Sequence, residues 1–149
     1  SNQEYLVGEL GSLYCLKNVV SDYSFNVVNS YSVALLHSLG VKRVTLSLEL
    51  TDSMIETLIT NYIKRYQKRP NLELIIKNRW ELMVLKFSLD NYYKSQVKYL
   101  VDRFKNYYHV VTKNKLTYIY DYKETIRGSD EKYFKMGINS LREENYEEI

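Results

Sequence analysis

The feature that most constrains the fold of this sequence is an alternation of short β-type runs with helical segments. Val41–Leu48 (VKRVTLSL) and Leu72–Lys77 (LELIIK) are rich in apolar and branched residues, and the segment between them has the apolar spacing of a helix. Strands that are separated by helices form right-handed crossovers and pair in parallel. The alternation therefore predicts an α/β fold with a parallel sheet.

The ends of two helices can be predicted from their capping residues. Asn29 or Ser30 is expected to cap a helix that runs through Leu39, with Leu39 on its buried face. A longer helix follows, whose apolar face carries Tyr62 and which Pro70 prevents from continuing. Thr51 can cap it, and Ser53 with Glu56 offers a competing capping box. Both helices follow predicted strands, as βα units require.

The remaining predicted elements are strands at 4–8, 22–28 and 82–87, an antiparallel meander at 97–104, 107–112 and 116–120, a helix at 129–136 and a strand at 138–141. These elements group into three regions. They are a βα half-barrel at 1–96, a β-meander insertion at 97–128, and a last αβ unit with an acidic tail at 129–149.

The length of the chain limits how much of a barrel it can form. A complete eight-stranded TIM barrel needs about 200–250 residues, whereas this chain has 149. The predicted fold class is therefore α/β, a partial (half) TIM-like barrel of parallel βα units with an antiparallel β-meander insertion. We expect one compact domain from a longer protein. Its open strand edges could be covered by the N-terminal part of the same polypeptide, which we favour, by a second copy in a homodimer, or by the meander folding back over one edge.

Cysteine and histidine are scarce, which excludes several kinds of site. A single cysteine, Cys15, cannot form an internal disulfide, and its apolar neighbours predict a buried, inert thiol. His37 and His109 are the only histidines, so we expect no metal. The composition favours a reducing, cytoplasmic compartment. No apolar run approaches the roughly 20 residues of a membrane-spanning helix, so we expect no membrane partner.

The positive charge is concentrated in the middle of the chain. Residues 61–115 carry 13 basic and 4 acidic side chains, a net charge of +9. Basic residues interleaved with aromatic rings are typical of RNA-binding surfaces. The tyrosines in question are Tyr62, Tyr66, Tyr92, Tyr93, Tyr99, Tyr107 and Tyr108. The competing interpretation is a solvated basic surface, with Tyr62 and Tyr66 in the core.

Functional groups of α/β folds gather at the carboxyl ends of the parallel strands. The polar residues predicted there are Asn26, Asn29, Ser47, Glu49, Arg79, Lys86 and Arg142. We predict Glu49 as the catalytic acid/base with Lys86 or Arg79 as its charge partner, and the others as substrate-binding residues for an anionic or peptide-like ligand. The competing interpretation is a helix cap for Asn29 and solvated loop charges for the rest.

Five segments, taken in order, resemble a known family. They are GELGSL (8–13), DYSFNVVNSYSVALLHSLGVKRVTLSLEL (22–50), LMVLKF (82–87), YLVDRF (99–104) and YFKMGINSLR (133–142). Together they are similar to the later part of the collagenase-like peptidases of bacteria, the unassigned peptidase family numbered thirty-two. The sharpest piece is the run from Asn26 to Leu50, which includes Glu49 in its Ser-x-Glu-Leu end.

The resemblance implies a barrel-like catalytic domain and a hydrolase that acts on a peptide or protein substrate. Some relatives act in the hydroxylation of tRNA or ribosomal RNA, and many hold an iron–sulfur cluster on cysteines that begin just after the LM-x-x-K strand. Here Ser88 stands at about the first cysteine position and no cysteine follows. We therefore predict no cofactor for this chain.

Three functions remain open on the sequence. The first is part of a collagenase-like peptidase, which the resemblance implies, although the H-E-x-x-H and G-x-S-x-G signatures are absent. The second is a component of RNA base modification that uses the basic region 61–115. The third is a non-catalytic binding or assembly module.

Overall fold

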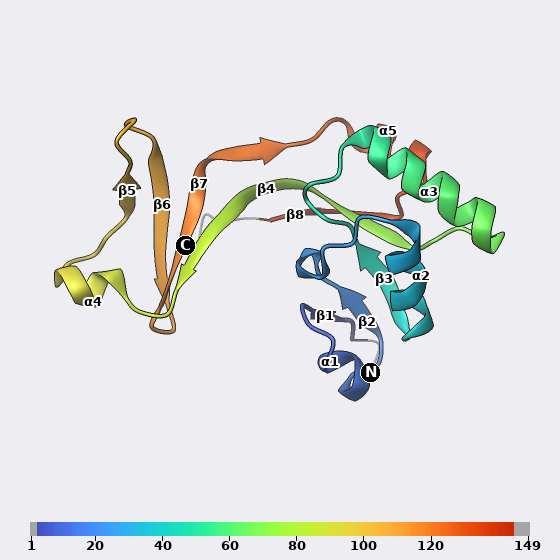
Figure 1. The fold of residues 1–149 in the computed structure, drawn as a ribbon, viewed down its shortest axis with the longest axis horizontal. Helices are drawn as coiled ribbons and strands as arrows, with labels where there is room; N and C mark the ends of the chain where they lie inside the picture. Colours follow the sequence, from blue (N-terminus) through green and yellow to red (C-terminus); the bar gives the residue numbers. More distant parts are fainter. Residues whose placement is uncertain (1–2, 145–149) are drawn as a thin grey trace. The chain divides into compact units, whose positions relative to one another are not determined.

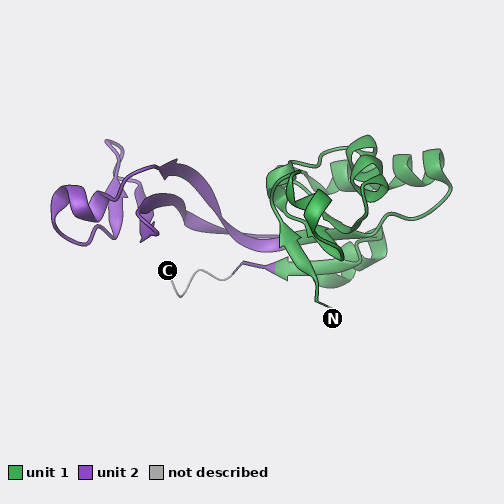
Figure 2. Ribbon diagram, turned by 90° about the horizontal axis from the view of Figure 1, so that it is seen from below, with its two compact units in different colours: residues 1–75, 128–142 green, residues 76–127, 143–149 purple. Residues whose placement is uncertain are grey.

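The computed structural model describes residues 3–144. The chain forms two compact units. The first unit comprises residues 1–75 and 128–142, and the second comprises residues 76–127 and 143–149 (Figures 1 and 2). The described residues form a mixed α/β fold with eight strands in a mixed sheet, and the long strand β4 (Leu72–Leu85) belongs partly to the first unit and partly to the second.

The first unit contains the parallel part of the sheet. Its strands are β1 (Tyr5–Val7), β2 (Val19–Ser21), β3 (Val41–Thr45), the start of β4, and β8 (Ser140–Glu143). Neighbours from β1 to β4 pair in parallel, and β8 pairs with β4. Parallel pairing of the strands predicted at 41–48 and 72–77 is confirmed, whereas the second parallel strand, β2, was not predicted.

Helices connect these strands in the way that the capping residues predict. The helical elements of the first unit are α1 (Ser12–Cys15), the 3-10 turn η1 (Tyr23–Phe25), α2 (Ser30–Ser38), α3 (Asp52–Tyr66) and α5 (Asp130–Met136). The Asn29 side chain accepts a hydrogen bond from the Ser32 N–H (2.9 Å), and Thr51 accepts one from Met54 (3.4 Å). Of the predicted alternatives, Asn29 caps α2 and Thr51 caps α3.

The core of the first unit lies between its sheet and helix α3. Val44 and Leu72 on the strands and Ile55 on α3 are fully buried, and so is the predicted core residue Tyr62. Leu39 was predicted on the buried face of α2, but it is 41 % exposed because it follows the last helical residue. Among the described residues no helix is long and apolar enough to span a bilayer.

A buried carboxylate, Glu73 at the start of β4, ties the strands of the first unit together. Its side chain is only 6 % exposed. It accepts hydrogen bonds from Arg43 and Thr45 on β3 and from Ser140 on β8, each 3.0 Å long, and lies 3.5 Å from the Arg142 guanidinium. Because its partners come from β3 and β8 while Glu73 itself lies on β4, Glu73 fixes the position of β8 against β4 and β3.

The second unit is an antiparallel sheet with one short helix. Its elements are the remainder of β4, α4 (Leu89–Tyr93), β5 (Tyr99–Val101), β6 (Tyr107–Lys113) and β7 (Leu116–Ile126). The order is β4–β7–β6–β5, and every neighbouring pair is antiparallel. The predicted meander is confirmed, although β7 is longer than predicted and also pairs with β4.

Two predicted strands differ from the structure. Residues 22–28 form η1 and a loop, because the Asp22 side chain accepts from the Tyr23 N–H (2.8 Å) and Asn26 adopts a left-handed conformation at φ 49°. The strand of that region is β2, which lies just before. Residues 82–87 were predicted as a separate strand, but no turn interrupts β4 between Leu72 and Leu85. The predicted acidic tail lies outside the described residues from 145 onward.

We expect Glu73→Ala to lower the free energy of unfolding by about 3–5 kcal/mol, because it leaves Arg43 and Arg142 without their buried counter-charge. Urea unfolding followed by circular dichroism measures this change. The matched control is Glu131→Ala, which removes a 76 % exposed carboxylate from an i,i+4 ion pair with Lys135 and should change the stability by less than about 0.5 kcal/mol. Equal effects of the two substitutions would contradict the role assigned to Glu73.

Candidate functional site

Three of the predicted site residues lie together in the first unit. The buried Ser47 hydroxyl donates to the Asn26 side-chain oxygen (2.7 Å) and accepts from the Glu49 N–H (3.3 Å). Glu49 lies in the turn that follows β3, and its side chain is exposed. The contacts fix the conformation of the two loops and leave the Glu49 carboxylate in solvent.

Two other predicted residues of the first unit have structural partners. The Asn29 oxygen caps α2 and also accepts from the Ser32 hydroxyl (3.2 Å). Arg142 on β8 forms ion pairs with Asp22 and with the buried Glu73. For Asn29, the competing interpretation as a helix cap is the one that the structure supports.

The remaining two predicted residues, Arg79 and Lys86, belong to the second unit. Arg79 lies on β4 and donates a hydrogen bond to the Tyr122 carbonyl on β7. Lys86 follows the last residue of β4 and is exposed. The predicted catalytic residues Glu49 and Lys86 thus lie in different units, and their partnership stays a prediction.

The most distinctive surface of the second unit is a cluster of aromatic rings, which we call the aromatic face. It consists of Tyr99 on β5, Tyr107 and His109 on β6, and Tyr122 on β7. The His109 ring stacks on Tyr122, with centroids 5.6 Å apart and an interplanar angle of 7°, and lies 5.0 Å from the Tyr99 ring. The centroid of the Tyr107 ring lies 6.5 Å from that of Tyr99 and 6.3 Å from that of Tyr122. The three tyrosines are each about half exposed (49–56 %).

Strand alternation explains why these rings lie on one face. Tyr99 pairs with His109 across β5 and β6, and alternate residues of a strand point to the same side. The opposite side carries Val110 and Ile119, which are directly paired and buried. Helix α4 lies against that side, because the Leu89 N–H donates to the buried Thr117 hydroxyl (3.0 Å). One side of the sheet is therefore core, and the other is aromatic and solvated.

The turn between β5 and β6 is held by Asp102. Its carboxylate accepts from the Phe104 N–H (2.8 Å), the Asn106 N–H (2.9 Å) and the Tyr108 hydroxyl (3.1 Å). These hydrogen bonds lower the pKa of Asp102, and the largest cause is a further bond from the Asn106 side-chain amide (2.9 Å). Tyr108 alternates with Tyr107 and His109 along β6, so it lies on the other side of the sheet and does not belong to the aromatic face.

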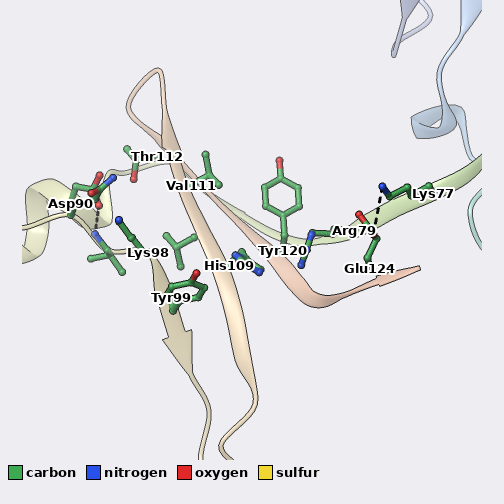
Figure 3. A pocket seen from close by; sticks show the side chains of 13 residues that line it. Lys77, Arg79, Asp90, Lys98, Tyr99, His109, Val111, Thr112, Tyr120 and Glu124 are labelled. Carbon is green, nitrogen blue, oxygen red and sulfur yellow. Dashed lines mark hydrogen bonds and ion pairs between the residues drawn. The ribbon is translucent and has the colours of Figure 1, made fainter. Parts of the chain in front are cut away.

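A pocket of about 600 Å³ adjoins the aromatic face within the second unit (Figure 3). Tyr99, His109 and Tyr120 line it, and so do three cationic side chains and two carboxylates. The charged residues are Lys77, Arg79, Lys98, Asp90 and Glu124. In the close-up, Lys98 lies on the Tyr99 side of the rings, whereas Arg79 and Lys77 lie on the Tyr120 side.

Two contacts position charged groups of the pocket. The Lys77 ammonium lies 3.8 Å from the Glu124 carboxylate, and the Val97 N–H donates to Asp90 (2.7 Å).

Burial, and to a lesser extent the positive charge of Arg79, lower the pKa of His109 below its usual 6.5. The imidazole is therefore neutral at neutral pH, which suits a ring that stacks.

Only part of this site was predicted from the sequence. Tyr99 and Tyr107 were named within the basic region, but no binding role was predicted for His109 or Tyr122. The signal was present: Tyr107 and His109 alternate along one strand, and Tyr120 and Tyr122 alternate along the next, beyond the turn at 113–115. The predicted meander already pairs these two strands, but its last strand ended at Tyr120, so the extension to Tyr122 and the register that brings the rings together were missed.

Cys15 was predicted to be buried, but it is exposed at the end of α1. Its apolar neighbours had suggested a core position, yet this helix buries none of its residues. Within residues 3–144, no group of three or more His, Cys, Asp or Glu side chains is arranged to hold a metal ion.

Comparison of the chain with known proteins gave no match to a family model, to a curated protein or to a solved structure. The functional argument therefore depends on the residues and contacts described above.

We expect Arg79→Gln to raise the pKa of His109, because it removes the nearby positive charge that disfavours the imidazolium. The pKa should stay below 6.5, since burial is the larger cause. An NMR titration of the histidine ring C–H signals measures it. Arg103→Gln is the matched control, since Arg103 packs over the Phe104 ring. No change with Arg79→Gln, or an equal change with the control, would contradict the arrangement.

Proposed function

We propose that this protein binds single-stranded RNA through the aromatic face of its second unit. The observation that carries the proposal is the contiguous set of solvent-exposed rings on one side of an antiparallel sheet. Single-stranded RNA presents unstacked bases, and proteins bind them by stacking aromatic side chains against them. A sheet that exposes rings from three neighbouring strands provides such a platform.

The cost of exposing these rings supports a binding role. Large aromatic side chains contribute most to stability when they are buried, and contiguous exposed apolar surface marks interaction sites. Here the opposite side of the same sheet has a small core of its own, around Val110 and Ile119. The aromatic face is thus not needed to complete that core.

The charge of the second unit matches a polyanion. Residues 76–127 contain eleven basic and five acidic side chains, a net charge of +6. Positive charge attracts the phosphate backbone without regard to sequence, and the attraction weakens as the salt concentration rises. Part of the basic region 61–115 lies instead in the first unit, where Lys64 belongs to α3. The second unit is therefore the part of that region that combines charge with exposed rings.

The proposal agrees with the RNA base-modification function that the resemblance offers as an alternative. On this reading the protein is a cytoplasmic RNA-binding component, and its βα units are half of a TIM-like barrel. The parallel pairs β1–β2, β2–β3 and β3–β4 support the barrel proposal. The proposal does not require the first unit to carry out chemistry.

We expect Tyr107→Ala and Tyr122→Ala each to weaken binding of a fluorescent single-stranded RNA of about eight nucleotides by about 5- to 100-fold. Stacking on one base contributes about 1–3 kcal/mol, which gives this factor. Fluorescence anisotropy measures the affinity. Tyr107→Phe should bind nearly as well as the native protein, because it keeps the ring.

The matched control is Tyr14→Ala, which removes an 85 % exposed tyrosine from α1 in the first unit. It should leave the affinity unchanged. The proposal is contradicted if the native protein does not bind the RNA at low salt, or if Tyr14→Ala weakens binding as much as Tyr107→Ala does.

A second candidate, a peptidase, follows from the family resemblance and from the cluster of Asn26, Ser47 and Glu49 after the parallel strands. The Ser47 contacts hold the Glu49 turn in a defined conformation, which supports a role for its carboxylate. Degradation of gelatin that is reduced at least tenfold by Glu49→Gln and is unaffected by Glu131→Gln would support this candidate. Equal activity of both variants, or none in the native protein, would reject it.

A further inference from the structure

We infer that the pocket beside the aromatic face binds a single nucleotide of the RNA strand, with the base against Tyr99 and His109 and the phosphate near Lys98. This inference rests on the proposed function and goes further by naming the unit of the ligand that enters the pocket. It also assigns different roles to the residues: Tyr107 and Tyr122 stack along the RNA strand, whereas Lys98 binds only the nucleotide in the pocket.

The pocket and the aromatic face are continuous. Tyr99 and His109 belong to both, whereas Tyr107 and Tyr122 belong to the face and are not among the described residues that line the pocket. A strand stacked on the face therefore reaches the pocket at the Tyr99–His109 pair, whose centroids are 5.0 Å apart. At this point a base can leave the line of stacked bases and enter the pocket.

The size of the pocket fits one nucleotide. Its volume of about 600 Å³ lies within the roughly 300–1,000 Å³ that is usual for small-molecule sites. The rings line it near the face, and charged side chains line its two sides (Figure 3). A nucleotide has the same division, with a flat aromatic base at one end and an anionic phosphate at the other.

Lys98 is the cation best placed for the phosphate. It directly precedes Tyr99, the first residue of β5, and its side chain is exposed. Lys77 is less suited, because it already lies 3.8 Å from Glu124. The Lys98 side chain lines the pocket on the side where Tyr99 lies (Figure 3), so its ammonium can contact the phosphate of a nucleotide whose base is held there.

The carboxylates indicate which bases fit. Asp90 on α4 lines the pocket, and its carboxylate accepts a hydrogen bond from the Val97 N–H (2.7 Å), which holds it in place. An ionised carboxylate only accepts hydrogen bonds, so it favours bases with an exocyclic amino group, such as cytosine and adenine, over uracil. It also opposes the entry of a bare phosphate ion. The lining therefore favours a complete nucleotide over inorganic phosphate.

His109 gives a signal that reports on the bound phosphate. The charge of Arg79 contributes to the low pKa of this histidine. A phosphate group bound near Lys98 would bring a negative charge close to the imidazole, which favours the protonated ring and raises the pKa of His109. A base stacked on the ring would in addition move its proton resonances by ring current, which inorganic phosphate cannot do.

The test is titration of the native protein with CMP, AMP, UMP, cytidine and inorganic phosphate, observed by NMR at the His109 ring. We expect CMP and AMP to bind more tightly than UMP, cytidine or phosphate, and to raise the pKa of His109. Lys98→Gln should weaken CMP binding about tenfold, the factor expected for the loss of one charge-assisted hydrogen bond. Lys113→Gln, an exposed change at the end of β6, is the matched control and should have no effect.

The same variants are then measured with the RNA oligonucleotide. We expect Lys98→Gln to weaken oligonucleotide binding more than Lys113→Gln does. If the oligonucleotide binds and depends on Tyr107, but CMP does not bind or Lys98→Gln acts like Lys113→Gln, the inference is overturned and the proposed function stands. Equal binding of phosphate and CMP also overturns it. If no oligonucleotide binds, the proposed function itself fails.

Discussion

The alternation of side chains along β6 and β7 determines the character of the second unit. Because successive residues point to opposite sides, Val110 and Ile119 enter a small core while His109 and Tyr122 lie on the other side. The Thr117 hydroxyl links the core side to the Leu89 N–H and the Phe87 carbonyl. With only one side of the sheet covered in this way, the rings on the other side face solvent, and both the RNA proposal and the pocket inference depend on that exposure.

The first unit is organised around a different interaction, the buried Glu73 carboxylate. Hydrogen bonds from two neighbouring strands and the guanidinium of Arg142 compensate its charge, which a buried carboxylate requires. Arg142, which the sequence predicts as a substrate-binding residue, takes part in this network and also pairs with Asp22.

Local signals in the sequence predicted the parts of the fold that local interactions decide. The caps Asn29 and Thr51 were predictable because each bonds within its own first turn. Residues 22–28 misled the prediction, because their alternating pattern resembles a strand while the Asp22 side chain stabilises a turn instead. The aromatic face was only partly predictable, since its His109–Tyr122 stack joins two strands through a pairing register that composition and charge do not specify.

The central claim is that RNA bases stack on the aromatic face, and photo-crosslinking tests it most directly. Ultraviolet irradiation of the protein with single-stranded RNA, followed by mass spectrometry, identifies the side chains in contact with bases. The account predicts crosslinks at Tyr99, Tyr107, His109 and Tyr122. Crosslinks confined to exposed tyrosines of the first unit, such as Tyr14 and Tyr31, or the absence of any crosslink, would contradict it.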